Sequence, residues 1–217
     1  MIEEYEPHLR PIHRILELVE FGHLEAASKI LHEALNLCED DWEQAIKDFG
    51  FRYMGAGAYS IVFQVPGRID VVKVNYNNYD VWWKYVDFVK QTSQNPMVPR
   101  IWDYHSHEGM MICRMELLQP LPYDTWVEGM VTTVKVVKSD MKVGGLTKRG
   151  LRDRIIKTLK TNLSFTGSVV YSPTMLAPIV KWMADVVDNN TVLVDCHAKN
   201  WMMRGNQIVL TDPISEG

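Results

Sequence analysis

Two aspartates and one asparagine stand close together at the end of the chain, in VDCHAKNWMMRGNQIVLTDPISEG at 194–217. Asp195 follows the apolar run VLV, Asn200 comes five residues later, and Asp212 comes twelve residues after that. The segments WMMR and QIVLT flank a Gly-Asn pair suited to positive φ angles, which predicts a β-hairpin. We expect this hairpin to bring Asn200 and Asp212 together. The alternative is that all three are ordinary turn residues.

These residue types would suit a site for a metal ion and a substrate hydroxyl. An amide oxygen from Asn200 and a carboxylate from Asp212 are hard oxygen ligands of the kind that Mg²⁺ prefers. Mg²⁺ keeps several waters and takes its other ligands from substrate phosphates, so two protein ligands suffice. Asp195 would remain available to orient a hydroxyl group. A site of this kind needs a nucleotide-binding half elsewhere in the chain.

The glycine-rich stretch GAGAYS at 55–60 is the candidate for that half. No G-K-[ST] follows it, which excludes a Walker A loop. A dinucleotide-binding fingerprint needs a helix directly after the glycines, whereas the strand-like IVFQV follows here. Two interpretations remain: a glycine-rich hairpin that covers a nucleotide, and a plain β-turn.

Lys73 lies in the apolar strand VVKV that comes next. Strand alternation predicts that Lys73 shares a sheet face with Val71 and points away from its two valine neighbours. Burying a lysine there is costly unless the charge is paired. Triphosphate oxygens would pair it, and so would a carboxylate from Asp80 or Asp87, which are seven residues apart on one helix face. The alternative is an edge-strand lysine that reaches water.

The elements that would position these residues form an α+β pattern. Apolar residues at three- and four-residue spacing predict helices over 9–48, with a break at Gly22 and a third helix starting at the acidic run Glu39-Asp40-Asp41. About five strands follow, with one helix after the third strand, and Asp80 is the expected N-cap of that helix. The expected strands are FRYM, IVFQV, IDVVKVNY, RIWDY and MMICRMELL.

Beyond the strands, the QPLP stretch at 119–122 is the expected boundary between two lobes. The rest is expected to be mainly helical, with a basic amphipathic segment at 148–161 and a helix at 173–188. The segment 130–147 is expected to form a loop. The predicted domains are a helical N-terminal extension at 1–49, a nucleotide-binding β lobe at 50–118, and a catalytic lobe at 119–217.

Composition narrows the classes of protein. The 217-residue chain is 47% hydrophobic and 23% charged, as in ordinary globular proteins. Its formal net charge of −4 gives no argument for nucleic acid binding. Three widely spaced cysteines without a C-x-x-C pair indicate neither a zinc site nor a disulfide framework, and a reducing cytoplasm is expected. We found no signal peptide or membrane-span pattern, so no membrane association is expected.

Taken in order, these motifs resemble the protein-kinase-like phosphotransferases, which combine a glycine-rich loop, a lysine on the third strand, an H-R-D-x-x-x-x-N loop and a D-F-G aspartate. The resemblance runs from about residue 50 to the end of the chain. It implies a two-lobed kinase-like fold with an antiparallel sheet lobe and a reduced helical lobe, and it implies ATP and Mg²⁺ as cofactors. The residues that match the nucleotide-binding motifs are Gly55, Gly57, Ser60, Lys73 with its acidic partner Asp80 or Asp87, Met115 as gatekeeper, and Glu116 to Leu118 as hinge. Asp195 matches the catalytic aspartate, and Asn200 and Asp212 match the metal ligands.

More narrowly, DCHAKNWMM and TDPIS resemble the early serine/threonine kinases of short-tailed bacteriophages. That resemblance implies phosphorylation of host proteins in the cytoplasm of an infected cell. Two features depart from the protein-kinase pattern: the H-R of H-R-D is LV here, and no activation segment follows Asp212. His197 stands where protein kinases carry Lys and small-molecule kinases carry His. The alternatives are therefore a small-molecule phosphotransferase of the aminoglycoside-kinase kind and a non-catalytic kinase-fold module that binds a host protein.

Overall fold

The computed structural model describes residues 6–77, 81–120, 150, 173–186, 192–194 and 200–216. The chain divides into two compact units, one of residues 1–80 with 100–117 and one of residues 81–99 with 118–217. The predicted α+β class is confirmed: the first unit joins helices to an antiparallel sheet, and the second combines helices with short strands. Among the described helices, none has the length and apolar character that a membrane crossing requires.

The sheet of the first unit has five strands in the order β1-β2-β3-β5-β4, and all neighbouring pairs are antiparallel. Its strands are β1 (Arg52–Gly57), β2 (Ser60–Gln64), β3 (Asp70–Asn75), β4 (Ile101–His107) and β5 (Met110–Glu116). The helix α4 (Trp82–Gln91) follows β3, so five strands with one helix after the third are found as predicted. The turn between β4 and β5 is tight because Glu108 and Gly109 both have positive φ, at 50° and 84°.

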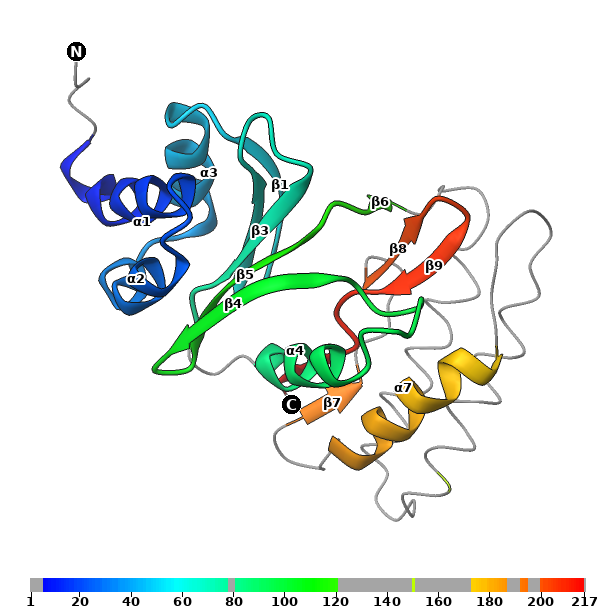
Figure 1. The fold of residues 1–217 in the computed structure, drawn as a ribbon. Helices are drawn as coiled ribbons and strands as arrows, with labels where there is room; N and C mark the ends of the chain where they lie inside the picture. The colour runs from blue at the N-terminus through cyan, green and yellow to red at the C-terminus, as the bar shows by residue number, and fades with distance from the viewer. Residues whose placement is uncertain are drawn as a thin grey trace. The chain divides into compact units, whose positions relative to one another are not determined.

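Helices α1 (Arg10–Glu20), α2 (Leu24–Lys29) and α3 (Glu39–Asp48) cover one face of this sheet (Figure 1). Short 3₁₀ turns, η1 (Pro7–Leu9) and η2 (Leu31–Ala34), complete the helical layer. One hydrophobic core joins the two layers. It combines helix residues such as Ile12, Leu16 and Trp42 with the sheet residues Ile61, Phe63, Val72, Val74 and Ile112. The helical layer and the sheet therefore form one folded body.

The predicted limits of these helices are close to the observed ones. The break between α1 and α2 falls at Gly22, which has φ 80°. The third helix begins at Glu39, as the acidic run indicated, and Asp41 accepts a hydrogen bond from the backbone N–H of Cys38 at 2.8 Å. This hydrogen bond at the helix N-terminus lowers the pKa of Asp41.

The second unit contains α4 and α7 (Pro173–Val186) together with the strands β6 (Gln119–Pro120), β7 (Val192–Val194), β8 (Trp201–Arg204), β9 (Gln207–Leu210) and β10 (Ile214–Glu216). The predicted C-terminal hairpin is β8–β9, and its turn contains Gly205 with φ 60°. One expectation is wrong: α4 starts at Trp82 with Val81 in the N-cap position, so Asp80 is not the N-cap.

The compact units differ from the domains predicted from the sequence because α4 and the segment after it group with the C-terminal part of the chain. Hydrogen bonds between residues 82–98 and residues 204–211, described below, connect these parts of the second unit. The basic segment at 148–161, apart from Gly150, and the expected loop at 130–147 lie outside the described residues.

Candidate functional site

The glycine-rich stretch forms the tight connection between β1 and β2. The strands close around the pair Ala58-Tyr59, because Gly57 pairs with Ser60. Gly55 has φ 146°, a conformation open to glycine and strained for other residues, and it follows an irregularity in the β1–β2 register. A plain two-residue β-turn needs no glycine with positive φ before it. The backbone of this hairpin therefore differs from that of a plain turn at Gly55.

The strand register places Gly55 and Lys73 in one row across the sheet. Gly55 pairs with Val62, Val62 pairs with Lys73, and Lys73 pairs with Cys113. Directly paired residues point to the same side of a sheet, so this row lies on the face opposite the helical layer. The prediction that Lys73 points away from Val72 and Val74 is confirmed, since both valines belong to the helix-side core. Lys73 is buried and lies on a central strand, which excludes the edge-strand alternative.

The next row on the same face joins the second glycine to two polar side chains. Gly57 pairs with Ser60, and Ser60 pairs with Asn75. Asn75 is 0% exposed, and its Oδ1 accepts a hydrogen bond from the N–H of Asn77 at 3.3 Å. Its Nδ2 has no hydrogen-bond partner among the described residues, although a buried donor without a partner is costly. An unsatisfied buried donor two residues from Lys73 is a feature that an oxygen-rich ligand would satisfy.

Glu116 and Leu118, the expected hinge residues, are both buried at the end of β5. The Glu116 carboxylate accepts a hydrogen bond from the N–H of Arg100 at 2.8 Å, and the Glu116 N–H donates to the Arg100 carbonyl at 3.0 Å. Glu116 pairs with Asp70, three residues from Lys73, so its side chain points to the other face of the sheet. A nucleotide on the Lys73 face would therefore meet Glu116 through its main chain.

Two small ladders hold the segment that contains Asp212. In the hairpin, Trp201 pairs with Leu210, and the N–H of Thr211 donates to the Asn200 carbonyl at 2.7 Å. The hairpin therefore places Asn200 opposite Thr211, one residue short of the expected Asp212. Two residues beyond Asp212, Ile214 pairs with Val194 in the β7–β10 ladder. Asp212 is thus fixed between two paired positions, directly after the residue that faces Asn200.

Several predicted site residues lie outside the described part of the chain. Asp80, Asp195 and His197 belong to this group. Asp87 lies in the middle of α4, in the second unit. Within the described residues, no three His, Cys, Asp or Glu side chains are grouped as a metal site. That result is compatible with the amide and single carboxylate predicted for Mg²⁺, which retains water ligands.

The sequence reasoning missed the contacts that hold the Asp212 segment on α4. The indole Nε1 of Trp82 donates to the Thr211 carbonyl at 3.2 Å, and the Tyr85 hydroxyl donates to the Leu210 carbonyl at 2.5 Å. Both aromatic residues are 0% exposed. A detectable signal existed, because a buried Trp and Tyr on one helix face each require a partner for their polar atom.

Each unit, taken by itself, carries residue types that suit one part of a nucleotide with a divalent cation. On the first unit, Lys73 supplies a positive charge and Asn75 an unsatisfied donor beside a glycine hairpin, as phosphate oxygens require. On the second unit, Asn200 and Asp212 supply the oxygen types that Mg²⁺ prefers. Lys73 and Asn75 lie inside β3, whereas Asn200 lies directly before β8 and Asp212 lies two residues after β9.

Comparisons with known proteins give matches among solved structures alone: no family model and no curated protein matches the chain. One matching structure is a thermostable mutant of aminoglycoside phosphotransferase APH(4)-Ia with ADP and hygromycin B, at 17% identity and TM-score 0.34, covering 81% of this chain and 72% of that one. Another mutant of the same enzyme, with AMP-PNP and hygromycin B, matches at 14% identity and TM-score 0.34, covering 83% and 73%. Both are phosphotransferases, but a TM-score this low carries no argument for the fold.

Proposed function

We propose that this protein is an ATP- and Mg²⁺-dependent kinase that phosphorylates serine and threonine hydroxyls of proteins. One observation carries the proposal: Gly55 and Gly57 begin two neighbouring rows of the sheet that contain Lys73 and Asn75, on the face opposite the helical layer. A lysine and an unsatisfied amide behind a glycine hairpin are suited to triphosphate oxygens. The sequence motifs of the C-terminal tail supply the matching metal and hydroxyl groups.

Each residue has a separate role in the proposed reaction. Lys73 binds the α- and β-phosphates, and the backbone of Gly55 and Gly57 covers the phosphates. Asn200 and Asp212 would hold Mg²⁺, which neutralises phosphate charge when it is bound. Asp195 orients the attacking hydroxyl and accepts its proton. Positioning and charge neutralisation then supply most of the acceleration.

The protein substrate is the finer part of the proposal. It is supported by the resemblance of DCHAKNWMM and TDPIS to the early kinases of short-tailed bacteriophages, and the proposed substrates are host proteins in the cytoplasm. The second candidate is a small-molecule phosphotransferase. His197 favours it, because small-molecule kinases carry His at that position.

Transfer of labelled phosphate from the γ-position of ATP tests the proposal. The purified chain would be incubated with Mg²⁺ and either a bacterial lysate or a panel of aminoglycosides. We expect label on lysate proteins at Ser and Thr, and none on the aminoglycosides. Label on an aminoglycoside alone would favour the second candidate, and no transfer to either would contradict both.

A pair of variants separates the proposed roles in the tail. Asp195→Asn should leave binding of ATP with Mg²⁺ nearly intact while transfer falls by roughly 10²-fold or more, the scale of a lost general base. Asp212→Asn should weaken Mg²⁺-dependent nucleotide binding itself. Nucleotide affinity by calorimetry and transfer rate would be measured on both. The roles are wrong if Asp195→Asn abolishes nucleotide binding while Asp212→Asn leaves transfer intact.

A further inference from the structure

The two residues before Asp212 have all of their backbone polar groups engaged. The N–H of Leu210 donates to the Met97 carbonyl at 2.9 Å, and the N–H of Thr211 donates to the Asn200 carbonyl. Their carbonyls accept from the side chains of Tyr85 and Trp82 on α4. Two of these four groups are therefore satisfied by side chains of a helix more than 120 residues earlier in the chain, with separations of 125 and 129 residues.

The register of the hairpin explains why α4 reaches this segment. Residues alternate along an antiparallel ladder between hydrogen-bonded and non-hydrogen-bonded pairs. The Thr211–Asn200 bond makes that pair a hydrogen-bonded one, so Leu210 belongs to a non-hydrogen-bonded pair. The N–H and C=O of Leu210 then point away from β8, toward Met97 and Tyr85. Without Met97 and Tyr85, these two groups would lack a partner within the hairpin.

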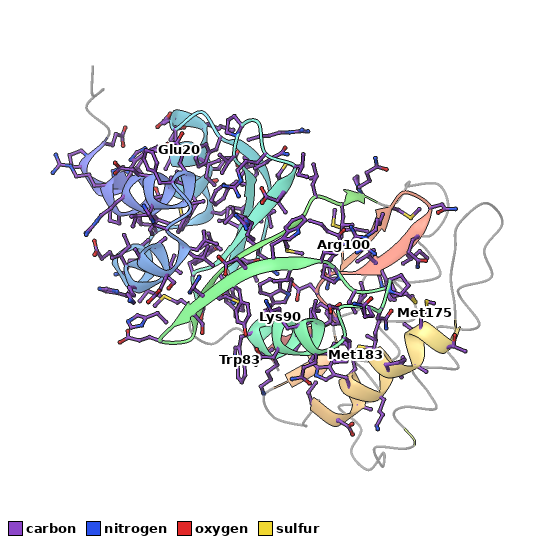
Figure 2. All side chains as sticks on the ribbon, in the orientation of Figure 1. Glu20, Trp83, Lys90, Arg100, Met175 and Met183 are labelled. Atoms are coloured by element: carbon purple, nitrogen blue, oxygen red, sulfur yellow. The ribbon has the colours of Figure 1, made fainter. Side chains whose placement is uncertain are left out.

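The Tyr85 ring is itself held by aromatic packing. Its centroid lies 6.1 Å from that of Phe88 and 5.4 Å from that of Trp182 on α7, and Phe88 stacks on Trp182 at 4.8 Å. Met183, the neighbour of Trp182 on α7 (Figure 2), is buried. Arg204 on β8 donates to the carbonyls of Pro96 and Val98 at 2.9 and 3.0 Å, so the hairpin is also attached to the segment that follows α4. The tyrosine hydroxyl therefore occupies a fixed position.

We infer that Tyr85 and Trp82 are positioning residues for the metal-binding aspartate, acting through the carbonyls of Leu210 and Thr211. The inference rests on the proposed function, because it assigns Asp212 to Mg²⁺. Asp212 has one residue between its own backbone and the carbonyl that Tyr85 holds. A ligand to Mg²⁺ must satisfy a strict octahedral geometry at about 2.0–2.1 Å, so small displacements of the segment change metal affinity.

Tyr85→Phe removes the hydroxyl and keeps the ring that packs on Phe88 and Trp182. The loss of one hydrogen bond predicts an increase of roughly 3- to 10-fold in the Mg²⁺ concentration that half-saturates nucleotide binding. Nucleotide affinity without Mg²⁺ should not change. Trp82→Phe should act in the same direction. The matched control is Trp83→Phe, because Trp83 is exposed on the outside of α4 (Figure 2).

A merely structural role would give a different result. It would lower the melting temperature and reduce the active fraction equally at every Mg²⁺ concentration, without a change in the half-saturating value. An unchanged half-saturating value in Tyr85→Phe would overturn the inference.

Hydrogen exchange of the metal-free protein provides a readout that is independent of the proposed activity. Peptides that contain Leu210 and Thr211 should exchange faster in Tyr85→Phe, while peptides from α1 and α3 should not change. Unchanged exchange would refute the anchoring itself. A third outcome combines faster exchange in Tyr85→Phe with no Mg²⁺-dependent nucleotide binding by the wild-type protein. In that case the proposed function fails, and the assignment of Tyr85 to metal binding is overturned with it. The contacts of α4 would then be purely structural.

Discussion

At the scale of single residues, Gly55 and Gly57 look alike in the sequence but carry different constraints. Gly55 has φ 146°, whereas a Cβ at Gly57 would meet the Ser60 Oγ at 3.1 Å without any positive φ. Gly55→Ala should cost about 1–3 kcal/mol of unfolding free energy, because an L side chain rarely adopts that conformation. Gly57→Ala should cost less, since the Ser60 hydroxyl can rotate away. Urea unfolding of both variants measures the difference, and an equal or reversed ranking would contradict the backbone argument.

At this scale the sequence predicted the orientation of one candidate site residue. Strand alternation alone predicted that Lys73 points away from Val72 and Val74, whereas its burial and the position of the helices on the other face came from the structure. Asn75 was missed, because an asparagine at a strand end resembles a turn residue and its unsatisfied amide is visible in three dimensions only. The assignments of Asp80, Asp195 and His197 remain predictions.

At the scale of elements, the helical layer contains a buried histidine. His13 on α1 is 6% exposed and stacks on Phe49 at 6.4 Å between ring centroids. Burial lowers its pKa from the usual 6.5, and the nearby carboxylate of Asp48 opposes this effect. Because the unfolded chain then binds the proton more readily, the stability contribution of His13 is present above about pH 6.5. It should be lost as the pH falls from that value toward the lower pKa of the folded state.

Chemical unfolding at pH 8 and at pH 5.5 measures this effect. The wild-type protein should lose more unfolding free energy between the two pH values than His13→Gln. An identical loss in both proteins would show that the pKa of His13 does not differ between the folded and unfolded states.

Among the elements, the helices and strands of the first unit were predictable because their apolar periodicity and turn residues are local signals. The start of α4 was not. Asp80 is a favourable N-cap by residue type, yet the N-cap is Val81, one residue later, and the helix begins at Trp82. The buried Trp82 and Tyr85 make long-range contacts with the C-terminal hairpin, and tertiary contacts of this kind override local capping preferences.

At the scale of the whole molecule, the proposal requires that residues of two compact units serve one nucleotide. We therefore expect titration calorimetry to give one ATP per chain in the presence of Mg²⁺. Lys73→Ala, in the first unit, and Asp212→Asn, in the second, should each weaken that single binding event. Lys90→Ala, an exposed lysine on α4 (Figure 2), is the control for lost charge. Two binding events, each sensitive to one substitution only, would show that the two halves act separately.

The strand order of the sheet also bears on how the chain folds during synthesis. β5 is made last of the five strands, yet it lies between β3 and β4, and among the described strands β4 has no other partner in the sheet. The core from Leu9 to Ile112 therefore cannot close until β5 has left the ribosome. At roughly 5–20 residues per second, the first helices wait on the order of 5–20 s with their apolar faces exposed. Nascent chains halted before Met110 should be cut by protease within the helical layer, and chains halted well beyond Glu116 should resist. The emergence of one central strand would then be the step that protects the growing polypeptide from proteolysis.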